Sequence, residues 1–161
     1  TITGGRIVET EAYSWKERGC HAFGAHKTAR NTVMFEKGGL AYVYMCYGIH
    51  FLFNVVTNRE DVPEAVLIRA LEPLTGLEEM RLRRGNLVND IHLTSGPGKL
   101  TKALGIGRSF NGKSLGDDEI WIEDSGMKLA KKDIVASERI GIDYAGEESV
   151  VVVMNAAVQP C

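Results

Sequence analysis

Two glutamates stand two residues apart near the start of the chain, within a segment, residues 6–13, that alternates in the manner of a β-strand. Glu9 and Glu11 would then share one face of that strand. Two neighbouring carboxylates suit general acid or base chemistry. The same spacing fits two surface glutamates that hold arginines, so the pattern alone leaves both interpretations open.

A second candidate is a tyrosine-rich segment, residues 40–54, in which two β-favouring runs flank Gly48 as in a β-hairpin. Tyr42 and Tyr44 would share a face, and Tyr47 would lie at the turn. An aromatic side chain at an exposed tip is costly to leave in water, and it could wedge between stacked bases of a nucleic acid. Packing in a core is the alternative, and it is weakest for Tyr47.

A third candidate, Arg69, interrupts the apolar run of residues 65–71, which predicts another strand. A guanidinium buried in a strand needs a partner, because burying it unpaired is very unfavourable. Glu9 or Glu11 is the natural partner. The pair would be either a structural ion pair or part of an active site.

The segment from Ser95 to Leu100 opens a predicted helix over residues 97–104, with a proline near its first turn and Gly105 at its end. Glycines that enter a helix leave backbone N–H groups free for an anion, and Lys99 adds positive charge. The segment lacks the phosphate-binding pattern of nucleotide-hydrolysing P-loops. A plain helix cap is the alternative.

The chain has three cysteines, Cys20, Cys46 and Cys161, and none forms a CxxC pair. This usage predicts a reducing compartment without a disulfide framework. Cys20 lies close in sequence to His21 and His26, but a fourth ligand at zinc-finger spacing is missing. We therefore expect no metal.

Other signals complete a mixed α+β domain with a mainly antiparallel sheet. Residues 75–84 predict a helix in which Thr75 and Glu78 form a capping box. Residues 14–32 are polar and predict a long loop or short helical turns. The remaining predicted elements are strands at residues 120–123 and 150–154 and a helix at residues 134–139.

Composition bounds these interpretations. The 161 residues are 44% apolar and 25% charged, as in an ordinary soluble globular domain with its own core. No apolar run reaches the roughly 20 residues that span a bilayer, and no signal peptide opens the chain. We expect an intracellular protein that contacts no membrane.

Charge is distributed unevenly along the chain. Lys and Arg number 19 and Asp and Glu number 21, so the net charge of −2 by itself disfavours a nucleic-acid partner. A basic stretch at residues 81–113 nevertheless holds seven cations against Asp90 alone, and acids gather at residues 117–124. A basic face beside an acidic face is compatible with phosphate binding, although a solvated surface has the same pattern.

In chain order, these segments resemble one family, the alkyladenine (3-methyladenine, or methylpurine) DNA glycosylases. The resemblance extends from residue 6 to about residue 148. The matching stretches are residues 6–13, 28–31, 34–35, 42–44, 47–48, 54, 66–73, 95–100 and 139–142.

The resemblance implies a single domain similar to the C-terminal domain of formyltransferases. Such a domain has a curved, mainly antiparallel sheet with surrounding helices and a protruding β-hairpin. The family's segment before the catalytic strand and its aromatic closing strand have no match. We therefore expect one glycosylase domain over residues 1–161 that lacks some terminal segments of the family.

The resemblance also implies an activity. The family flips alkylated or deaminated purines, of the 3-methyladenine, 7-methylguanine and hypoxanthine class, out of double-stranded DNA and hydrolyses the N-glycosidic bond. We expect base-excision repair by a monofunctional enzyme without lyase activity, acting as a monomer without a cofactor. It would reside in the cytoplasm or nucleoid of a bacterium or the nucleus of a eukaryote.

The match assigns roles to individual residues. Glu11 corresponds to the general base, and Arg69 and the backbone of Ile140 correspond to the groups that hold the attacking water. Tyr47 corresponds to the intercalating residue. The remaining assignments are Tyr13, His21 and Tyr44 as the clamp around the flipped base and Asn54 as the group that crowds the 2-amino group of guanine. From the helix start and its charge, we also expect Gly98 and Lys99 to contact DNA phosphates.

Two alternatives stay open. A non-catalytic nucleic-acid-binding domain on the same scaffold, such as a tRNA-binding domain of the formyltransferase type, would need neither Glu11 nor Arg69. A small-molecule glycosidase or nucleosidase would not need Tyr47 at an exposed tip.

Overall fold

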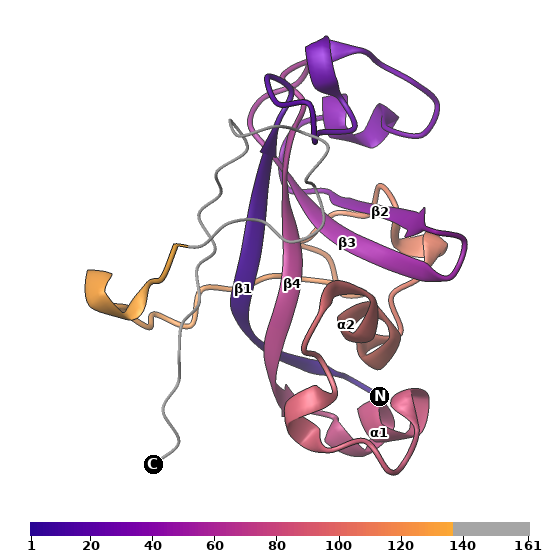
Figure 1. The fold of residues 1–161 in the computed structure, drawn as a ribbon, viewed down its shortest axis with the longest axis vertical. Coiled ribbons are helices and arrows are strands. Elements are labelled where there is room, and N and C mark those ends of the chain that lie inside the picture. Colours follow the sequence, from indigo (N-terminus) through magenta and orange to yellow (C-terminus); the bar gives the residue numbers. More distant parts are fainter. Residues whose placement is uncertain (137–161) are drawn as a thin grey trace.

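The computed structural model describes residues 1–136, and within them it contains one four-stranded sheet of order β1-β4-β3-β2 with antiparallel neighbours. The strands are β1 (Gly4–Ser14), β2 (Ala41–Cys46), β3 (His50–Thr57) and β4 (Glu64–Thr75). Figure 1 shows β1 and β4 as two long neighbouring strands, with the β2–β3 hairpin projecting to one side. The predicted α+β class and antiparallel sheet are confirmed.

The long pair β1–β4 carries an irregularity at its middle. Ile7 pairs with Leu71 and Glu9 with Ala70, so the register shifts on both sides of Glu9. A bulge of this kind bends a strand and redirects the side chains beside it. The bend therefore falls between Ile7 and Thr10, where the strand carries its first candidate carboxylate.

The predicted hairpin is confirmed, and its turn explains the glycine. The backbone N–H of Ile49 donates to the carbonyl oxygen of Cys46 at 3.2 Å, which closes a tight turn. Its two central residues, Tyr47 and Gly48, have φ of 51° and 72°. Positive φ at both positions is the requirement of a type I′ turn, the turn that best matches the twist of a two-stranded ribbon. The geometry directs Tyr47 outward at the tip.

The helix predicted over residues 97–104 is confirmed as α2 (Pro97–Leu104), which ends at Gly105 with φ of 75°. Proline suits the first turn because its missing N–H would have no helical partner there. Glycine adopts the left-handed conformation of the cap without strain. Both ends of this helix are therefore set by its own sequence.

The helix α1 (Leu77–Arg84) corrects the expected start and cap. Thr75 belongs to β4 and pairs with Gly4, so it is not available as a cap. Gly76 precedes the helix with φ of 74°, and no side chain caps the first turn. The predicted capping box with Glu78 is wrong because β4 continues to Thr75, four residues beyond the predicted end of the strand at residue 71.

Elsewhere the described chain is mostly irregular. The predicted strand at residues 120–123 is wrong, since only Trp121 forms a bridge there, with Gly116. Residues 134–136 are not helical, and the rest of the helix predicted at 134–139 and the strand at 150–154 lie outside the described residues. The short 3-10 helices are Phe23–Ala25, Thr32–Phe35, Asp90–His92, Arg108–Phe110 and Lys131–Asp133.

The core lies on both sides of the hairpin strands. One cluster joins the loop of residues 14–35 to Tyr42 and Val56, and a second packs α2 beneath Val43 and Phe53. Tyr42 is 2% exposed, so core packing is the correct interpretation for this tyrosine. Within residues 1–136, none of the helices is long and apolar enough to cross a membrane.

Candidate active site

The Glu9–Arg69–Glu11 cluster joins β1 to β4 where β1 is bulged. Arg69 Nε lies 2.7 Å from Glu9 Oε1, and Arg69 Nη1 lies 3.1 Å from Glu11 Oε1. Both predicted partners are therefore confirmed. Burial opposes the charged guanidinium, but the hydrogen bond to Glu9 and the charges of both carboxylates outweigh it and raise the pKa of Arg69.

The two carboxylates differ in their surroundings. The side chain of Glu11 is 1% exposed, whereas that of Glu9 is 25% exposed. Tyr13 donates its hydroxyl proton to Glu11 Oε2 at 2.9 Å. Glu11 Oε1 is buried and accepts no hydrogen bond from residues 1–136 beyond its ion pair with Arg69. An oxygen of this kind is well suited to receive a proton from a bound water or ligand.

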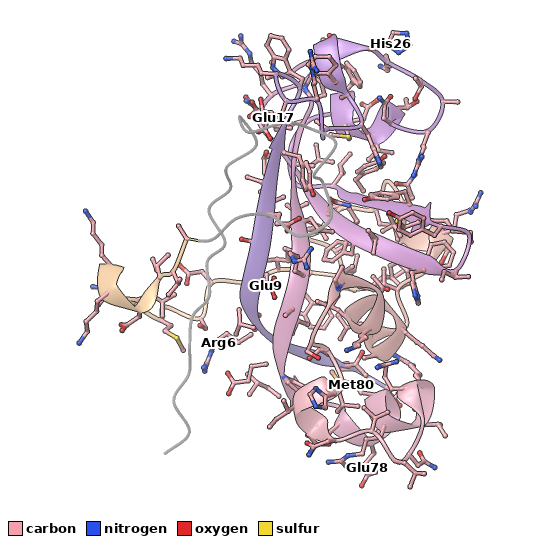
Figure 2. All side chains as sticks on the ribbon, in the orientation of Figure 1. Arg6, Glu9, Glu17, His26, Glu78 and Met80 are labelled. Atoms are coloured by element: carbon pink, nitrogen blue, oxygen red, sulfur yellow. The ribbon has the colours of Figure 1, made fainter. Side chains whose placement is uncertain are left out.

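Glu11 lies in the wall of a cavity of about 460 Å³, a volume typical of small-molecule sites. All four strands, the loop of residues 14–35 and the start of α2 contribute to the wall. Figure 2 shows Glu9 on β1, well away from α1, where Glu78 and Met80 lie. The predicted site residues that the structure brings together around the cavity are Glu11, Tyr13, His21, Tyr44, Tyr47, Asn54 and Arg69.

The aromatic part of the wall is a cluster of His21, Tyr42 and Tyr44. The His21 ring lies 4.5 Å from Tyr44 between centroids, at an interplanar angle of 68°. His21 Nδ1 lies 2.9 Å from the Tyr42 hydroxyl oxygen. Burial and the positive charge of Arg30 lower the pKa of His21 to about 4, so its ring is neutral at pH 7. One ring nitrogen is then a donor and the other an acceptor.

The loop that carries His21 is held by Asn31, which is 1% exposed. Its side-chain amide nitrogen donates to the carbonyl oxygens of His21 and His26, each at 2.9 Å. Its amide oxygen accepts from the Thr28 N–H at 2.7 Å. Such a satisfied buried network fixes a loop that has little regular structure. Residue-level reasoning missed this role, although an asparagine within a long polar loop is a signal that could have indicated it.

Asn54 and Arg30 both line the cavity, but Asn54 is buried and Arg30 is exposed. Asn54 is 3% exposed, and its Nδ2 donates to the carbonyl oxygen of Tyr42 across the hairpin at 3.1 Å. Arg30 is exposed, and its guanidinium carbon lies 5.1 Å from the centroid of the Tyr44 ring. Sequence reasoning gave Arg30 no site role, although it lies in the matching stretch of residues 28–31.

The two predicted DNA contacts at α2 lie beside the cavity. Pro97 lines it, while Lys99 is exposed in the same first turn of the helix. A Cβ atom on Gly98 would lie 2.9 Å from Cγ of His50. Glycine at this position therefore allows α2 to approach the hairpin closely, whether or not it also contacts DNA. Ile140 lies outside the described residues.

The first three arginines of the basic stretch at residues 81–113 bind acidic side chains and backbone carbonyl oxygens. Arg81 binds both carboxylate oxygens of Asp90, at 2.8 and 2.7 Å. Arg83 binds Glu79 and the Ala103 carbonyl oxygen, and Arg84 binds the Leu93 carbonyl oxygen. These arginines tie α1 to neighbouring segments, so they do not form a free basic face.

Two further features carry none of the predicted chemistry. A hollow of about 580 Å³ lies between residues 36–40 and 114–116. Within residues 1–136, no group of three or more His, Cys, Asp or Glu side chains is placed to hold a metal ion. The cavity at Glu11 is therefore the candidate site that the described residues support.

Known proteins are similar to this chain over most of its length. The family model for methylpurine-DNA glycosylase (MPG) matches residues 1–156. Three relatives are named as candidate 3-methyladenine DNA glycosylases. They come from Chlamydia abortus (48% identity over 90% of this chain and 76% of the relative), Natranaerobius thermophilus (46% over 88% and 73%) and Encephalitozoon cuniculi (46% over 90% and 70%). The chain therefore belongs to the methylpurine-DNA glycosylase family.

Proposed function

We propose that this protein is a DNA base-excision repair glycosylase that removes alkylated or deaminated purines from double-stranded DNA. The substrates would be purines of the 3-methyladenine, 7-methylguanine and hypoxanthine class. The observation that carries the proposal is the buried carboxylate of Glu11, held by Arg69 in an aromatic-lined cavity of about 460 Å³. The names of the relatives support the same reaction.

The exposed hairpin supports action on duplex DNA. The glycosidic bond of a stacked base is inaccessible, so the base must leave the helix at a cost of a few kcal/mol. Tyr47 is 89% exposed at a turn beside the cavity mouth. It would fill the gap left by the extruded base and so replace part of the lost stacking.

The cavity wall would then hold the extruded purine. Tyr13, His21 and Tyr44 offer aromatic faces and edges for a flat base. Asn54, fixed by its bond to Tyr42, would crowd the 2-amino group of an undamaged guanine. Selectivity would thus combine general stacking with rejection of one normal substituent.

The proposed chemical step is hydrolysis. Glu11 Oε1 accepts a proton from a water molecule, whose oxygen bonds to C1′ of the sugar as the bond from C1′ to the base nitrogen breaks. The bonding electron pair leaves with the base. The carboxylate also stabilises the positive charge that develops on the sugar. Arg69, together with the backbone of Ile140, would orient the water.

Water is the nucleophile in this scheme, so the enzyme would be monofunctional and leave an intact abasic site. No cofactor takes part in any step. We further propose that the protein acts as a monomer and resides with the cell's DNA, in a nucleoid or a nucleus. A non-catalytic binding domain is the weaker alternative, because mere binding does not need a buried carboxylate with an open oxygen.

The test is incubation with duplex oligonucleotides that carry one hypoxanthine or one 3-methyladenine. Abasic sites should appear, and strand breaks should follow only after added alkali. The Glu11→Gln variant is the matched control and should leave the lesion in place. Absence of abasic sites with the wild type would refute the proposed function, and breaks without alkali would refute the monofunctional mechanism.

A further inference from the structure

Arg30 places a positive charge in the wall of the proposed base cavity. Its guanidinium carbon lies 5.1 Å from the centroid of the Tyr44 ring, and its Nη2 donates to the carbonyl oxygen of Met45 at 3.4 Å. The residue that follows it, Asn31, is fixed by three hydrogen bonds to the same loop. The backbone at Arg30 is therefore well positioned, and its side chain covers one part of the cavity wall.

Arg69 is paired with carboxylates, whereas Arg30 is not paired with any carboxylate among residues 1–136. Arg69 contacts both Glu9 and Glu11. The positive charge of Arg30 also acts on the cavity wall, since it is one of the two causes that lower the pKa of His21. The cavity wall therefore holds both the Glu11–Arg69 ion pair and a cation, Arg30, that has no carboxylate partner among residues 1–136.

We propose that Arg30 is a specificity-determining residue that favours neutral damaged purines over cationic alkylated purines. The inference rests on the proposed function. Hypoxanthine is neutral, whereas 7-methylguanine in DNA carries a positive charge. A base stacked on Tyr44 would therefore experience the repulsion of Arg30 only if it is cationic.

The difference in charge between the two kinds of base persists through cleavage of the glycosidic bond. The electron pair of the glycosidic bond moves to the base, so a cationic base becomes neutral and a neutral base becomes negative. The two bases differ by one unit of charge at every stage, and Arg30 stabilises the more negative one. Since specificity is the ratio of the two kcat/KM values, this difference enters the ratio directly.

The expected size of the specificity effect follows from the distance between the Arg30 guanidinium and the bound base. A base stacked about 3.5 Å beyond the Tyr44 ring would lie roughly 9 Å from the guanidinium. At that separation, the repulsion between two unit charges weakens binding of a cationic base by roughly twofold in a water-like medium. The factor rises to roughly twentyfold at the lower dielectric constant near a protein surface. Because Arg30 is exposed, we expect a change of about three- to tenfold.

The experiment compares excision of 7-methylguanine and hypoxanthine from duplexes of identical sequence. Both lesions compete in one reaction, and the ratio of kcat/KM values is measured for the wild type, Arg30→Gln and Arg30→Lys. Arg59→Gln removes an exposed arginine that does not line the cavity and serves as a charge-matched control. A phosphate contact by Arg30 would weaken both reactions equally and cancel in the ratio.

The ratio should shift about three- to tenfold toward 7-methylguanine in Arg30→Gln and stay near the wild-type value in Arg30→Lys and Arg59→Gln. An unchanged ratio in Arg30→Gln, with both lesions still excised, would overturn this inference alone. An equal shift in Arg30→Lys would also overturn it, because packing rather than charge would be responsible. A wild type that excises neither lesion would overturn the proposed function and this inference with it.

Discussion

At the residue scale, the proposed site depends on the different roles of two nearby glutamates, Glu9 and Glu11. The sequence places both on one strand face, and it predicts Arg69 as their partner. The spacing alone does not show which of them is buried, and only the family resemblance assigns the general base to Glu11. The structure shows which one is buried: the bulge at Glu9 and the burial of Glu11 leave only Glu11 with an enclosed oxygen beside the cavity.

We predict that Glu11→Gln reduces single-turnover excision by roughly 10²- to 10⁴-fold, the usual contribution of a general base. Binding of the lesion duplex should persist, because the aromatic wall is unchanged. Glu9→Gln should lose much less activity, since Glu9 supports Arg69 from outside the cavity. Near wild-type turnover in Glu11→Gln with loss of activity in Glu9→Gln would reverse the assignment.

A second prediction concerns His21, whose pKa is lowered to about 4 by burial and by Arg30. The unfolded chain binds a proton at the ordinary pKa of about 6.5, so between pH 6.5 and 4 the unfolded state is more protonated than the folded state. Stability should therefore be fully present above pH 6.5 and decline as the pH falls toward 4.

Denaturant unfolding at pH 7 and pH 5 checks this prediction. His21→Gln should lose less stability between the two pH values than the wild type does. The difference should be modest, because His21 is only partly buried and solvent screens its charge. An NMR titration in which His21 protonates near pH 6.5 would contradict the assignment.

At the element scale, the hairpin is the feature that the sequence predicts best. Two β-favouring runs around a glycine specify both the pairing and the turn, and the turn places Tyr47 outside any core. Features that depend on distant pairing are predicted poorly. The start of α1 is decided by the pairing of Thr75 with Gly4, which no local pattern records.

We predict that Tyr47→Ala weakens binding of a lesion duplex by roughly one to two powers of ten, since stacking of an aromatic on a base is worth about 1–3 kcal/mol. The thermal midpoint should change little, because the 89% exposed side chain leaves no cavity in the core. Leu82→Ala, at a similarly exposed position on α1, is the control and should affect neither. Unchanged affinity, or a large loss of thermal stability, would mean that the hairpin tip is not the wedge.

The contact between α2 and the hairpin gives a further prediction. Gly98→Ala would place a Cβ atom 2.9 Å from Cγ of His50, so either the His50 side chain or the helix must shift. We expect a loss of about 1–3 kcal/mol in the free energy of unfolding, as for other overpacked sites. Gly107→Ala is the matched control, because its Cβ would meet only Phe51 at 4.0 Å. Equal stability of the two variants would show that the close approach is not needed.

At the scale of the whole molecule, the charge pattern is more informative with the structure than without it. The sequence shows one basic stretch at residues 81–113, which predicts a phosphate-binding face. In the structure its first three arginines bind Asp90, Glu79 and backbone carbonyls around α1. Ion pairs of this kind are invisible in a linear count of charges, because their partners are chosen by the fold.

Lys99 and Lys102 on α2 are in a different position, since both are exposed and Pro97 at the start of the same helix lines the cavity. We therefore expect the affinity for duplex DNA to fall steeply with salt despite the net charge of −2. Each lysine that contacts a phosphate releases about one counterion, which adds roughly 0.9 to the slope of log affinity against log salt.

Binding of an undamaged duplex is measured by fluorescence anisotropy over a series of salt concentrations. Lys99→Gln should reduce the magnitude of the slope by about one, the contribution of a single phosphate contact. Arg81→Gln should leave the slope unchanged, because Arg81 is bound to both oxygens of Asp90. These two substitutions remove the same charge from the same stretch of sequence, so a difference between them can only come from where the fold places each residue. A flat plot for the wild type, or an equal change in both variants, would refute a phosphate-binding face at α2.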